Sequence, residues 1–489
     1  MYSKYFSLLS LLSTSLVAGA TDPLEIIGTK WFNSNTGEEF IIKGVAYQPG
    51  GSGSEDPIAN TAQLANAIPL FTELGINAIR VYETSANLNH DQGMQMLSDA
   101  GIYVIFDLSN PNSSINRNDP TYDTNTMAYF AGNEVNNSVN NTDSNPFVKA
   151  TVRDMKAHMK AQKRYIPIGY ANNDDSQTLQ NIVNYFNCGS EDDRIDFFGY
   201  NIYSWCKPTD TMQTSGYDKK TAMFENYGIP AFFSEYGCNT DPPRQFDDIP
   251  YLYSSPMNNV FSGGLVYEFT EESNNYGLVQ ANGNNFTIMP DFTTYKNQLS
   301  KLKLSPTNKS SYTPPSNNGT TCPSEGSDWQ ASNNLPPTPS VDACNCLMGT
   351  YGCIVSSSFN VTAQSSSVSQ LFQYACGQGK VDCSPLTANG TSGVYGNISF
   401  CDPTTQLSYA LNSMYTQSNK NKDTCTSNGT GSIQSPSSNS ESTCLSKAAN
   451  LQQSAGSGSG SSGSSNNGQL LLPSFASLGI ATIIAVLFI

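Results

Sequence analysis

Short apolar runs rich in β-branched and aromatic residues recur along the first two thirds of the chain, and polar or helical stretches separate them. This alternation indicates parallel strands joined by helical crossovers. Eight parallel strands with intervening helices close into a (β/α)8 barrel, so the predicted fold class is α/β. The runs are FIIKGVAYQ from Phe40, NAIRVYE from Asn77, YVIFDLS from Tyr103, YFAGNEV from Tyr129, IPIGYAN from Ile166, DFFGYNIY from Asp196, IPAFFSEYGC from Ile229 and GGLVYEFT from Gly263.

Polar and aromatic side chains occur where these runs end. In a parallel barrel all strands end at one mouth, and the active sites of such barrels are built there. We therefore expect these side chains to line a common cleft. They are Gln48, Tyr82, Asp107, Asn133, Glu134, Tyr203, Glu235 and Tyr267.

The composition changes after the barrel pattern ends. Residues 313–343 are rich in Pro, Ser and Asn and predict a linker. Residues 344–446 hold eight cysteines with little apolar periodicity, which is typical of a small α+β module that depends on disulfides. Residues 447–468 are mostly Ser, Gly and Asn, too polar to bury a core, and predict a flexible stalk.

Both ends of the chain carry sequence features of processing signals. Residues 1–20 combine Lys4, an apolar run and small residues up to Ala20, which indicates a secretory signal rather than a buried first helix. Residues 469–489 form an uncharged apolar tail after a polar spacer, the order of a glycolipid (GPI) anchor signal. The alternative is a retained transmembrane helix, against which Pro473 and the lack of a cationic stop both count. We expect the protein on the outer face of the plasma membrane and in the cell wall.

Composition and charge exclude several classes of function. Twelve cysteines in an exported chain imply disulfides, and two histidines, His90 and His158, supply neither a histidine metal cluster nor Ser-His-Asp machinery. We expect no metal and no cofactor. The net charge of −16 repels phosphate backbones, so we expect no nucleic-acid partner.

Two carboxylates carry the predicted chemistry. Glu134 follows Asn133 at the end of the fourth run, and Glu235 follows Ser234 at the end of the seventh. Glycoside cleavage with retention needs a protonated carboxyl and an ionised one about 5–5.5 Å apart, and these two runs place both residues at one mouth. The alternative, two buried carboxylates with structural roles only, is disfavoured by the cost of burying unpaired like charges.

The chain resembles a known family in several long stretches. These include KGVAYQPG, DLSNPNSSINRNDP, YFAGNEVNNSVNNTDSNPFVKATVRDMK, FFSEYGCN and GGLVYEFTEESNNYGLV, while CPSEGSDWQ, CNCL and GTSGVYGNISFCDPTTQLSYALN extend the match into the second block. On these motifs the chain is similar to the fungal, GPI-anchored β-1,3-glucanosyltransferases of glycoside hydrolase family 72. Its second block resembles their eight-cysteine glucan-binding module (X8, carbohydrate-binding module family 43).

The resemblance implies a role for each site residue. Residues 21–312 would form the catalytic (β/α)8 domain, with Glu134 as the acid/base and Glu235 as the nucleophile. Donor-cleft positions match Gln48, Tyr82, Asp107, Asn133, Tyr203 and Tyr267, and Tyr276 matches a position near the acceptor. The implied partners are β-1,3-glucan donor and acceptor chains, and the implied bridges are Cys188–Cys322 and Cys206–Cys238.

The activity implied is cleavage of an internal β-1,3 linkage and transfer of the new reducing end to a second glucan chain, by retaining double displacement. Two alternatives stay open from the residues. One is a β-1,3-glucan hydrolase on the same barrel, and the other is a weakly active or non-catalytic protein that binds wall glucan.

Two departures from the family pattern are visible. No cysteine precedes Cys188, so a bridge usual in the first third of the barrel is absent. Only TYDTNTMAY separates Pro120 from Phe130, so the crossover helix before Glu134 is missing. Either the recorded sequence has lost a segment, which we favour, or a true variant closes this part of the barrel with a loop. We expect no full helix between Asp107 and Glu134.

Overall fold

The computed structural model describes residues 21–51, 56–85, 87–108, 125–378, 380–426 and 429–448. The predicted secretory signal, the predicted anchor signal and nearly all of the predicted stalk lie outside these ranges. Across the ranges described, no helix is both long enough and apolar enough to traverse a bilayer. The same ranges hold no cluster of His, Cys, Asp and Glu suited to a metal ion.

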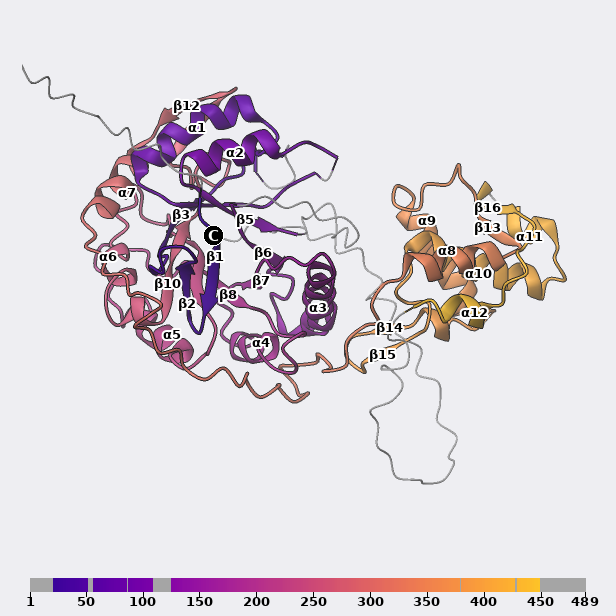
Figure 1. The fold of residues 1–489 in the computed structure, drawn as a ribbon. Coiled ribbons are helices and arrows are strands. Elements are labelled where there is room, and N and C mark those ends of the chain that lie inside the picture. The colour runs from indigo at the N-terminus through magenta and orange to yellow at the C-terminus, as the bar shows by residue number, and fades with distance from the viewer. Residues whose placement is uncertain are drawn as a thin grey trace, which may run out of the picture. The chain divides into compact units, whose positions relative to one another are not determined.

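The predicted (β/α)8 barrel is confirmed (Figure 1). Eight strands close in the order β10-β3-β4-β5-β6-β7-β8-β9, and each of the eight predicted runs contributes one of them. Six strands are buried at every position, as expected for a parallel sheet covered on both faces. The strands are β3 (Ile42–Ala46), β4 (Ala78–Val81), β5 (Tyr103–Asp107), β6 (Thr126–Asn133), β7 (Ile168–Asn172), β8 (Phe197–Ile202), β9 (Ala231–Tyr236) and β10 (Phe261–Val266).

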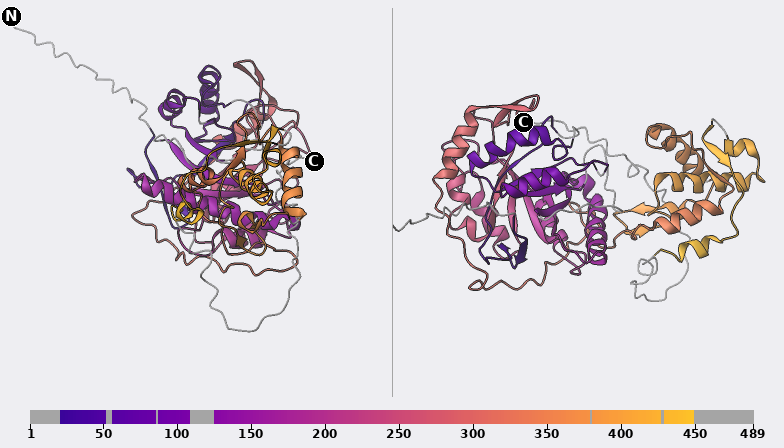
Figure 2. Two further views of the ribbon diagram at one scale, coloured as in Figure 1. Left: turned by 90° about the vertical axis from the view of Figure 1, so that its right-hand side faces the viewer. Right: turned by 45° about the horizontal axis from the view of Figure 1, so that its top comes forward.

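The chain divides into two compact units, Met1–Phe130 with Asp196–Asn317, and Ala131–Ile195 with Asn318–Ile489. The first unit contains the helices α1 (Thr61–Leu74), α2 (Asp91–Asp99), α5 (Tyr217–Phe224), α6 (Ile249–Leu252) and α7 (Pro290–Ser300) and the 3-10 turn η2 (Met257–Asn259). Helices α1 and α2, in indigo, lie side by side in all views (Figures 1 and 2).

Helix α1 illustrates how the sequence fixes these elements. The Asn60 side chain accepts a hydrogen bond from the backbone N–H of Gln63 and caps the first turn. Gly75 ends the helix with φ of 74°, a left-handed conformation that glycine adopts without steric cost. Its buried face consists of Leu64, Ala67, Phe71 and Leu74, at helical spacing.

Two antiparallel hairpins also belong to the first unit. β1 (Leu24–Ile27) pairs with β2 (Lys30–Asn33), and β11 (Val279–Asn282) pairs with β12 (Asn285–Ile288). Trp31 on β2 is fully buried and its ring lies 5.5 Å from that of Phe197, the first residue of β8. The first hairpin therefore covers the amino-terminal end of a barrel strand, the end opposite the expected cleft.

The segment before Glu134 is described only in part. The crossover before β6 is the one expected to lack its helix. Most of it, residues 109–124, lies outside the described ranges. β6 begins at Thr126 and pairs in parallel with β5, with Phe106 opposite Tyr129 and Asp107 opposite Phe130. Of the residues described between Asp107 and Glu134, none is helical.

The second unit begins with the elements around β7. These are the 3-10 turn η1 (Val139–Ser144), α3 (Asn145–Ala161) and α4 (Leu179–Phe186). The segment that the sequence predicted as a linker lies along them. Cys322 is bonded to Cys188, and Trp329 is 1% exposed with its ring 5.2 Å from that of Tyr185. The backbone N–H of Gln330 donates to the Thr142 hydroxyl. This segment is thus bound along its length rather than free.

The remaining residues of the second unit form a module of short helices and hairpins, coloured orange to yellow in Figure 2. Its helices are α8 (Val341–Thr350), α9 (Ser365–Phe372), α10 (Pro403–Gln417), α11 (Lys422–Thr426) and α12 (Glu441–Leu445), with the π-helical turn η3 (Gln373–Gly377) and the 3-10 turn η4 (Ser384–Leu386). β13 (Cys353–Val355) pairs with β16 (Gly431–Ile433), and β14 (Ala388–Asn389) pairs with β15 (Val394–Tyr395).

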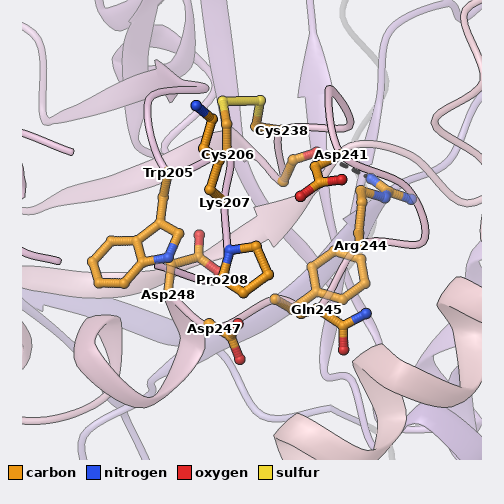
Figure 3. A pocket seen from close by; sticks show the side chains of 12 residues that line it. Trp205, Cys206, Lys207, Pro208, Cys238, Asp241, Arg244, Gln245, Asp247 and Asp248 are labelled. Carbon is orange, nitrogen blue, oxygen red and sulfur yellow. Dashed lines mark hydrogen bonds between the residues drawn. A yellow bond between two sulfur atoms is a disulfide. The ribbon is translucent and has the colours of Figure 1, made fainter. Parts of the chain in front are cut away.

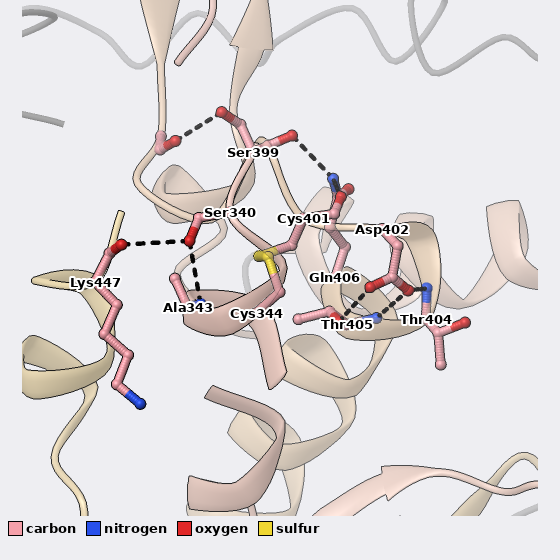
Figure 4. The surroundings of a disulfide bond; sticks show 11 residues. Ser340, Ala343, Cys344, Ser399, Cys401, Asp402, Thr404, Thr405, Gln406 and Lys447 are labelled. Carbon is pink, nitrogen blue, oxygen red and sulfur yellow. Dashed lines mark hydrogen bonds between the residues drawn. A yellow bond between two sulfur atoms is a disulfide. The ribbon is translucent and has the colours of Figure 1, made fainter. Parts of the chain in front are cut away.

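Four disulfides hold this module: Cys344–Cys401, Cys346–Cys444, Cys353–Cys425 and Cys376–Cys383. The first joins the starts of two helices (Figure 4). Ser340 caps α8 by accepting from the backbone N–H of Ala343, and Asp402 caps α10 by accepting from the backbone N–H groups of Thr404 and Thr405. The bridge therefore links two capped helix termini, and it lies in an apolar cluster with Leu347, Tyr351 and Ile398.

Candidate active site

The Glu235 carboxylate is the centre of the candidate site. Glu235 lies in β9 and is 8% exposed. Its Oε1 accepts hydrogen bonds from an Arg80 guanidinium N–H at 3.0 Å and from the Tyr82 hydroxyl at 2.9 Å, and its Oε2 accepts from the Tyr203 hydroxyl at 2.8 Å. Three donors on two oxygens favour the ionised form and fix the plane of the carboxylate.

Arg80 is the buried cation of this site. It lies in β4, is 0% exposed, and forms two parallel hydrogen bonds of 2.9 Å to Asp107 at the end of β5. Its guanidinium carbon also lies 4.5 Å from the ring centroids of Tyr82 and Phe130. Burial raises the pKa of the Asp107 carboxyl, and the charge of Arg80 opposes that shift. One cation therefore serves two carboxylates, Asp107 and Glu235.

Four tyrosines surround the Glu235 carboxylate. Their rings meet edge to face, with centroids 5.4 Å apart for Tyr267 and Tyr276, 5.7 Å for Tyr203 and Tyr276, and 6.4 Å for Tyr82 and Tyr267. Burial raises the pKa of all four hydroxyls, most strongly for Tyr82, Tyr203 and Tyr267. The hydroxyls therefore remain protonated at neutral pH, and those of Tyr82 and Tyr203 donate to Glu235.

Gln48 braces the same region from the end of β3. Its side-chain oxygen accepts hydrogen bonds from the backbone N–H groups of Tyr82 at 3.1 Å and Glu83 at 2.9 Å. The amide thereby fixes the backbone that carries the Tyr82 hydroxyl. The first unit thus brings together seven residues that the sequence analysis singled out: Gln48, Tyr82, Asp107, Tyr203, Glu235, Tyr267 and Tyr276.

Asn133 and Glu134 belong to the second unit, where both are half-buried. Glu134 directly follows β6 and has φ of 50°, in the left-handed region that non-glycine residues seldom adopt. Its backbone N–H donates to the carbonyl of Ala171 in β7 at 2.9 Å. Such a conformation costs about 1–3 kcal/mol and is concentrated at functional positions.

Three residues of the site were not singled out from the sequence. Arg80 was hidden within the apolar run NAIRVYE, although a cation inside a buried strand is a signal in itself. Glu268 follows Tyr267 and is 2% exposed. Arg244 pairs with Asp291 and donates to the backbone carbonyls of Tyr267 and Tyr276, so it clamps the loop that carries both tyrosines.

The Cys206–Cys238 bridge supports the loop after β9. It ties the loop after β8 to the loop after β9, and it is one of the two barrel bridges that the resemblance implied; Cys188–Cys322 is the other. A cavity of about 20 Å³ lies beside it, lined by Trp205, Pro208, Arg244 and Asp248 among others (Figure 3). This volume accommodates about one water molecule and is too small for a sugar ring.

Comparison with known proteins gives a consistent result. The family model described as glucanosyltransferase matches residues 13–303, and the X8 domain model matches residues 348–432. Protein EPD1 of Candida maltosa is 42% identical over 446 residues, covering 87% of this chain and 80% of its own length. The 1,3-beta-glucanosyltransferase gas1 of Schizosaccharomyces pombe is 37% identical over 463 residues, covering 88% and 83%.

Solved structures of other proteins share this fold. The structure of Saccharomyces cerevisiae Gas2p in complex with laminaritriose and laminaritetraose superposes with a TM-score of 0.76 at 37% sequence identity. The match covers 84% of this chain and 97% of that one, so it includes both the barrel and the cysteine-rich module.

Proposed function

Because this chain belongs to the glucanosyltransferases of glycoside hydrolase family 72, we propose that it cuts β-1,3-glucan and transfers the new end to a second glucan chain, with Glu235 as nucleophile and Glu134 as acid/base. The observation that carries the assignment of Glu235 is its carboxylate, held by Arg80, Tyr82 and Tyr203. A nucleophile must be ionised and correctly oriented, and these donors supply both conditions.

In the first step a Glu235 oxygen forms a bond to the anomeric carbon of the donor glucan, and the bond from that carbon to the leaving oxygen breaks. Glu134 gives its proton to the leaving oxygen, so the shortened chain departs with a free hydroxyl. The product is a glycosyl ester on Glu235. Hydrogen bonds from Tyr82 and Tyr203 keep the ester in place for the second step.

In the second step the 3-hydroxyl of an acceptor glucan attacks the same anomeric carbon. Glu134, now a carboxylate, takes the proton of that hydroxyl, and Glu235 leaves as a carboxylate. The configuration at the anomeric carbon is retained, and the acceptor is longer. Transfer wins over hydrolysis when sugar rather than water occupies the acceptor side, where Tyr276 supplies an aromatic face.

Support for Glu134 comes from its place directly after β6, because the strands of a parallel barrel all end at the same rim. Asn133 precedes it and offers an amide that can bind the sugar 2-hydroxyl. The strained φ of Glu134 adds to this support. Gln48, Tyr82, Asp107, Tyr203 and Tyr267 complete the proposed donor side, with Gln48 and Asp107 acting through Tyr82 and Arg80.

Product analysis tests the reaction. The protein is incubated with a reduced laminari-oligosaccharide, and the products are resolved by mass spectrometry. Transfer gives chains longer than the substrate together with shorter ones. Only shorter chains would identify a hydrolase, and glucan binding without turnover would identify a wall-binding protein.

A trapping experiment separates the two carboxylates. Glu134→Gln should still form the glycosyl ester from a laminari-oligosaccharyl fluoride, whose leaving group needs no acid, but should resolve it slowly. Peptide mapping should then find the sugar on Glu235. Glu235→Gln should give no adduct, and an adduct elsewhere would remove the assignment.

We also propose that the protein works at the wall, held to the outer face of the plasma membrane by a GPI anchor. Membership of the family supports a location beside wall glucan, and the tail sequence at residues 469–489 supports the anchor. Phosphatidylinositol-specific phospholipase C should release the protein from cells. A mature protein that still carries Leu470–Ile489 would rule the anchor out.

A further inference from the structure

Glu268 is a buried carboxyl beside the proposed cleft that the double displacement does not use. It follows β10 and is 2% exposed. Its Oε1 accepts a hydrogen bond of 2.8 Å from the side-chain amide of Asn274, and the same amide donates to the Tyr267 hydroxyl at 3.3 Å. The Tyr267 hydroxyl and the Glu268 carboxyl also influence each other's pKa, so the two groups are electrostatically coupled. Tyr267, Glu268 and Asn274 thus form one hydrogen-bonded set, in which the Asn274 amide donates to both other groups.

We propose that Glu268 is a positioning residue that, with Asn274, determines whether the Tyr267 hydroxyl donates or accepts a hydrogen bond toward sugar bound beside Glu235. This inference rests on the proposed function, because it takes Tyr267 as part of the sugar-binding cleft. The backbone on both sides of the set is fixed. Tyr267 N–H donates to the Tyr236 carbonyl at 2.9 Å, and Glu268 N–H donates to the Tyr276 carbonyl at 3.1 Å.

The direction of the hydrogen bond that Tyr267 offers to a sugar depends on whether Glu268 can donate a hydrogen. An ionised carboxylate only accepts, so it takes the O–H of Tyr267 and the N–H of Asn274. The Tyr267 oxygen can then only accept from a sugar hydroxyl. A protonated Glu268 has a hydrogen of its own to give, which releases the Tyr267 O–H to donate into the cleft. One proton on Glu268 therefore reverses the sense of the hydrogen bond that Tyr267 offers.

Burial, more than the surrounding charges, makes this proton available near neutral pH. Burial, with the like charges of Glu272 and Glu235, raises the pKa of Glu268 to about 7, while the hydrogen bonds from Asn274 and Tyr267 oppose the shift. Other charged or titratable groups facing this turn are Tyr276 and Arg244, and Arg244 is paired with Asp291. Glu272 itself accepts from the backbone N–H of Gly50 at 2.8 Å.

The test measures transfer kinetics on a laminari-oligosaccharide from pH 5 to 9 in the wild type and in Glu268→Gln. We expect the wild-type KM to change about 3–10-fold, the worth of one hydrogen bond, around a midpoint near pH 7. In Glu268→Gln the KM should stay constant across this midpoint. Glu272→Gln removes a like charge and should move the midpoint to lower pH, whereas the distant surface variant Glu73→Gln should leave it unchanged.

A second measurement does not depend on activity. Infrared difference spectra between pH 5.5 and 8.5 should contain a carboxylic-acid band that is lost in Glu268→Gln and kept in Asp248→Asn. An unchanged KM profile in Glu268→Gln, or no band specific to Glu268, would overturn the inference. Failure of the proposed function is distinguishable, because the wild type would then form no longer chains at any pH.

Discussion

Arg80 holds Asp107 through two parallel N–H···O bonds of 2.9 Å, and both residues are almost completely buried. Nη1 of the same guanidinium donates to Glu235 at 3.0 Å and to the Ser234 carbonyl at 3.3 Å. Glu235, the proposed nucleophile, therefore shares its counter-ion with a second carboxylate.

Arg80→Met should destabilise the protein strongly. It leaves two buried carboxylates without their cation, and removing one partner of a buried ion pair costs about 3–5 kcal/mol. Denaturant unfolding followed by circular dichroism measures the change in free energy of unfolding. Lys296→Met is the matched control, since its pair with Glu73 lies at the surface with side chains 41% and 42% exposed, and its loss should cost less than about 1 kcal/mol. Equal effects in both variants would contradict the shared counter-ion.

Loss of the Cys206–Cys238 bridge should lower both stability and rate. Its 32-residue separation corresponds to about 3–4 kcal/mol of chain entropy. Replacement of both cysteines by Ser also frees the loop three residues after Glu235, so kcat on a soluble oligosaccharide should fall. The comparison variant replaces Cys376 and Cys383, whose separation is 7 residues and which lie in the cysteine-rich module. That variant should lose stability but keep kcat; a parallel loss of kcat would show that the module bridge also supports the barrel.

Asp248 should make stability depend on pH between about 4 and 7. It is 3% exposed, and burial raises its pKa from 3.8 to about 7 while the Tyr217 hydroxyl donates to it at 3.2 Å. The folded protein therefore binds this proton more tightly than the unfolded chain does. The stability it contributes is complete below pH 4 and is lost as pH rises to 7, on the order of 4 kcal/mol at most. Unfolding free energies of Asp248→Asn should vary less over this range, and an unchanged slope would exclude Asp248 as the cause.

The segment at residues 313–343 should behave as part of the fold. Trp329→Ala removes a side chain that is 1% exposed and should cost about 3–5 kcal/mol of unfolding free energy. Glu325→Ala changes an exposed position of the same segment and should stay within about 0.5 kcal/mol. Limited proteolysis of the native protein should spare the segment. Rapid cleavage there, with no loss of stability in Trp329→Ala, would restore the interpretation as a free linker.

The barrel could be predicted from the sequence because its strands are buried on both faces. Each strand therefore appears in the sequence as a continuous apolar run between polar stretches. The site residues at the ends of these runs could be predicted for the same reason. Six of them, Glu235 included, do come together at the candidate site, since parallel strands bring their ends together.

Other features depend on contacts that composition does not encode. The partner of Arg80 lies 27 residues away on the next strand, and nothing in NAIRVYE identifies it. Glu268 is one of three acidic residues in EFTEE, and only its burial distinguishes it. The Pro, Ser and Asn content of residues 313–343 predicts a linker, but the burial of Trp329 against Tyr185 holds the segment to the fold.

The second unit has a consequence for the order of synthesis. Residues 131–195 are completed by a segment that begins at Asn318, and the bridge between Cys188 and Cys322 spans 134 residues. At about 5–20 residues per second, Cys322 emerges roughly 7–27 s after Cys188. Cys206 and Cys238 emerge within that interval, so in a secreted chain the nascent Cys188 thiol meets two wrong partners before its own. Correct oxidation of this protein therefore requires either that Cys206 and Cys238 pair first or that a thiol exchange returns Cys188 to Cys322.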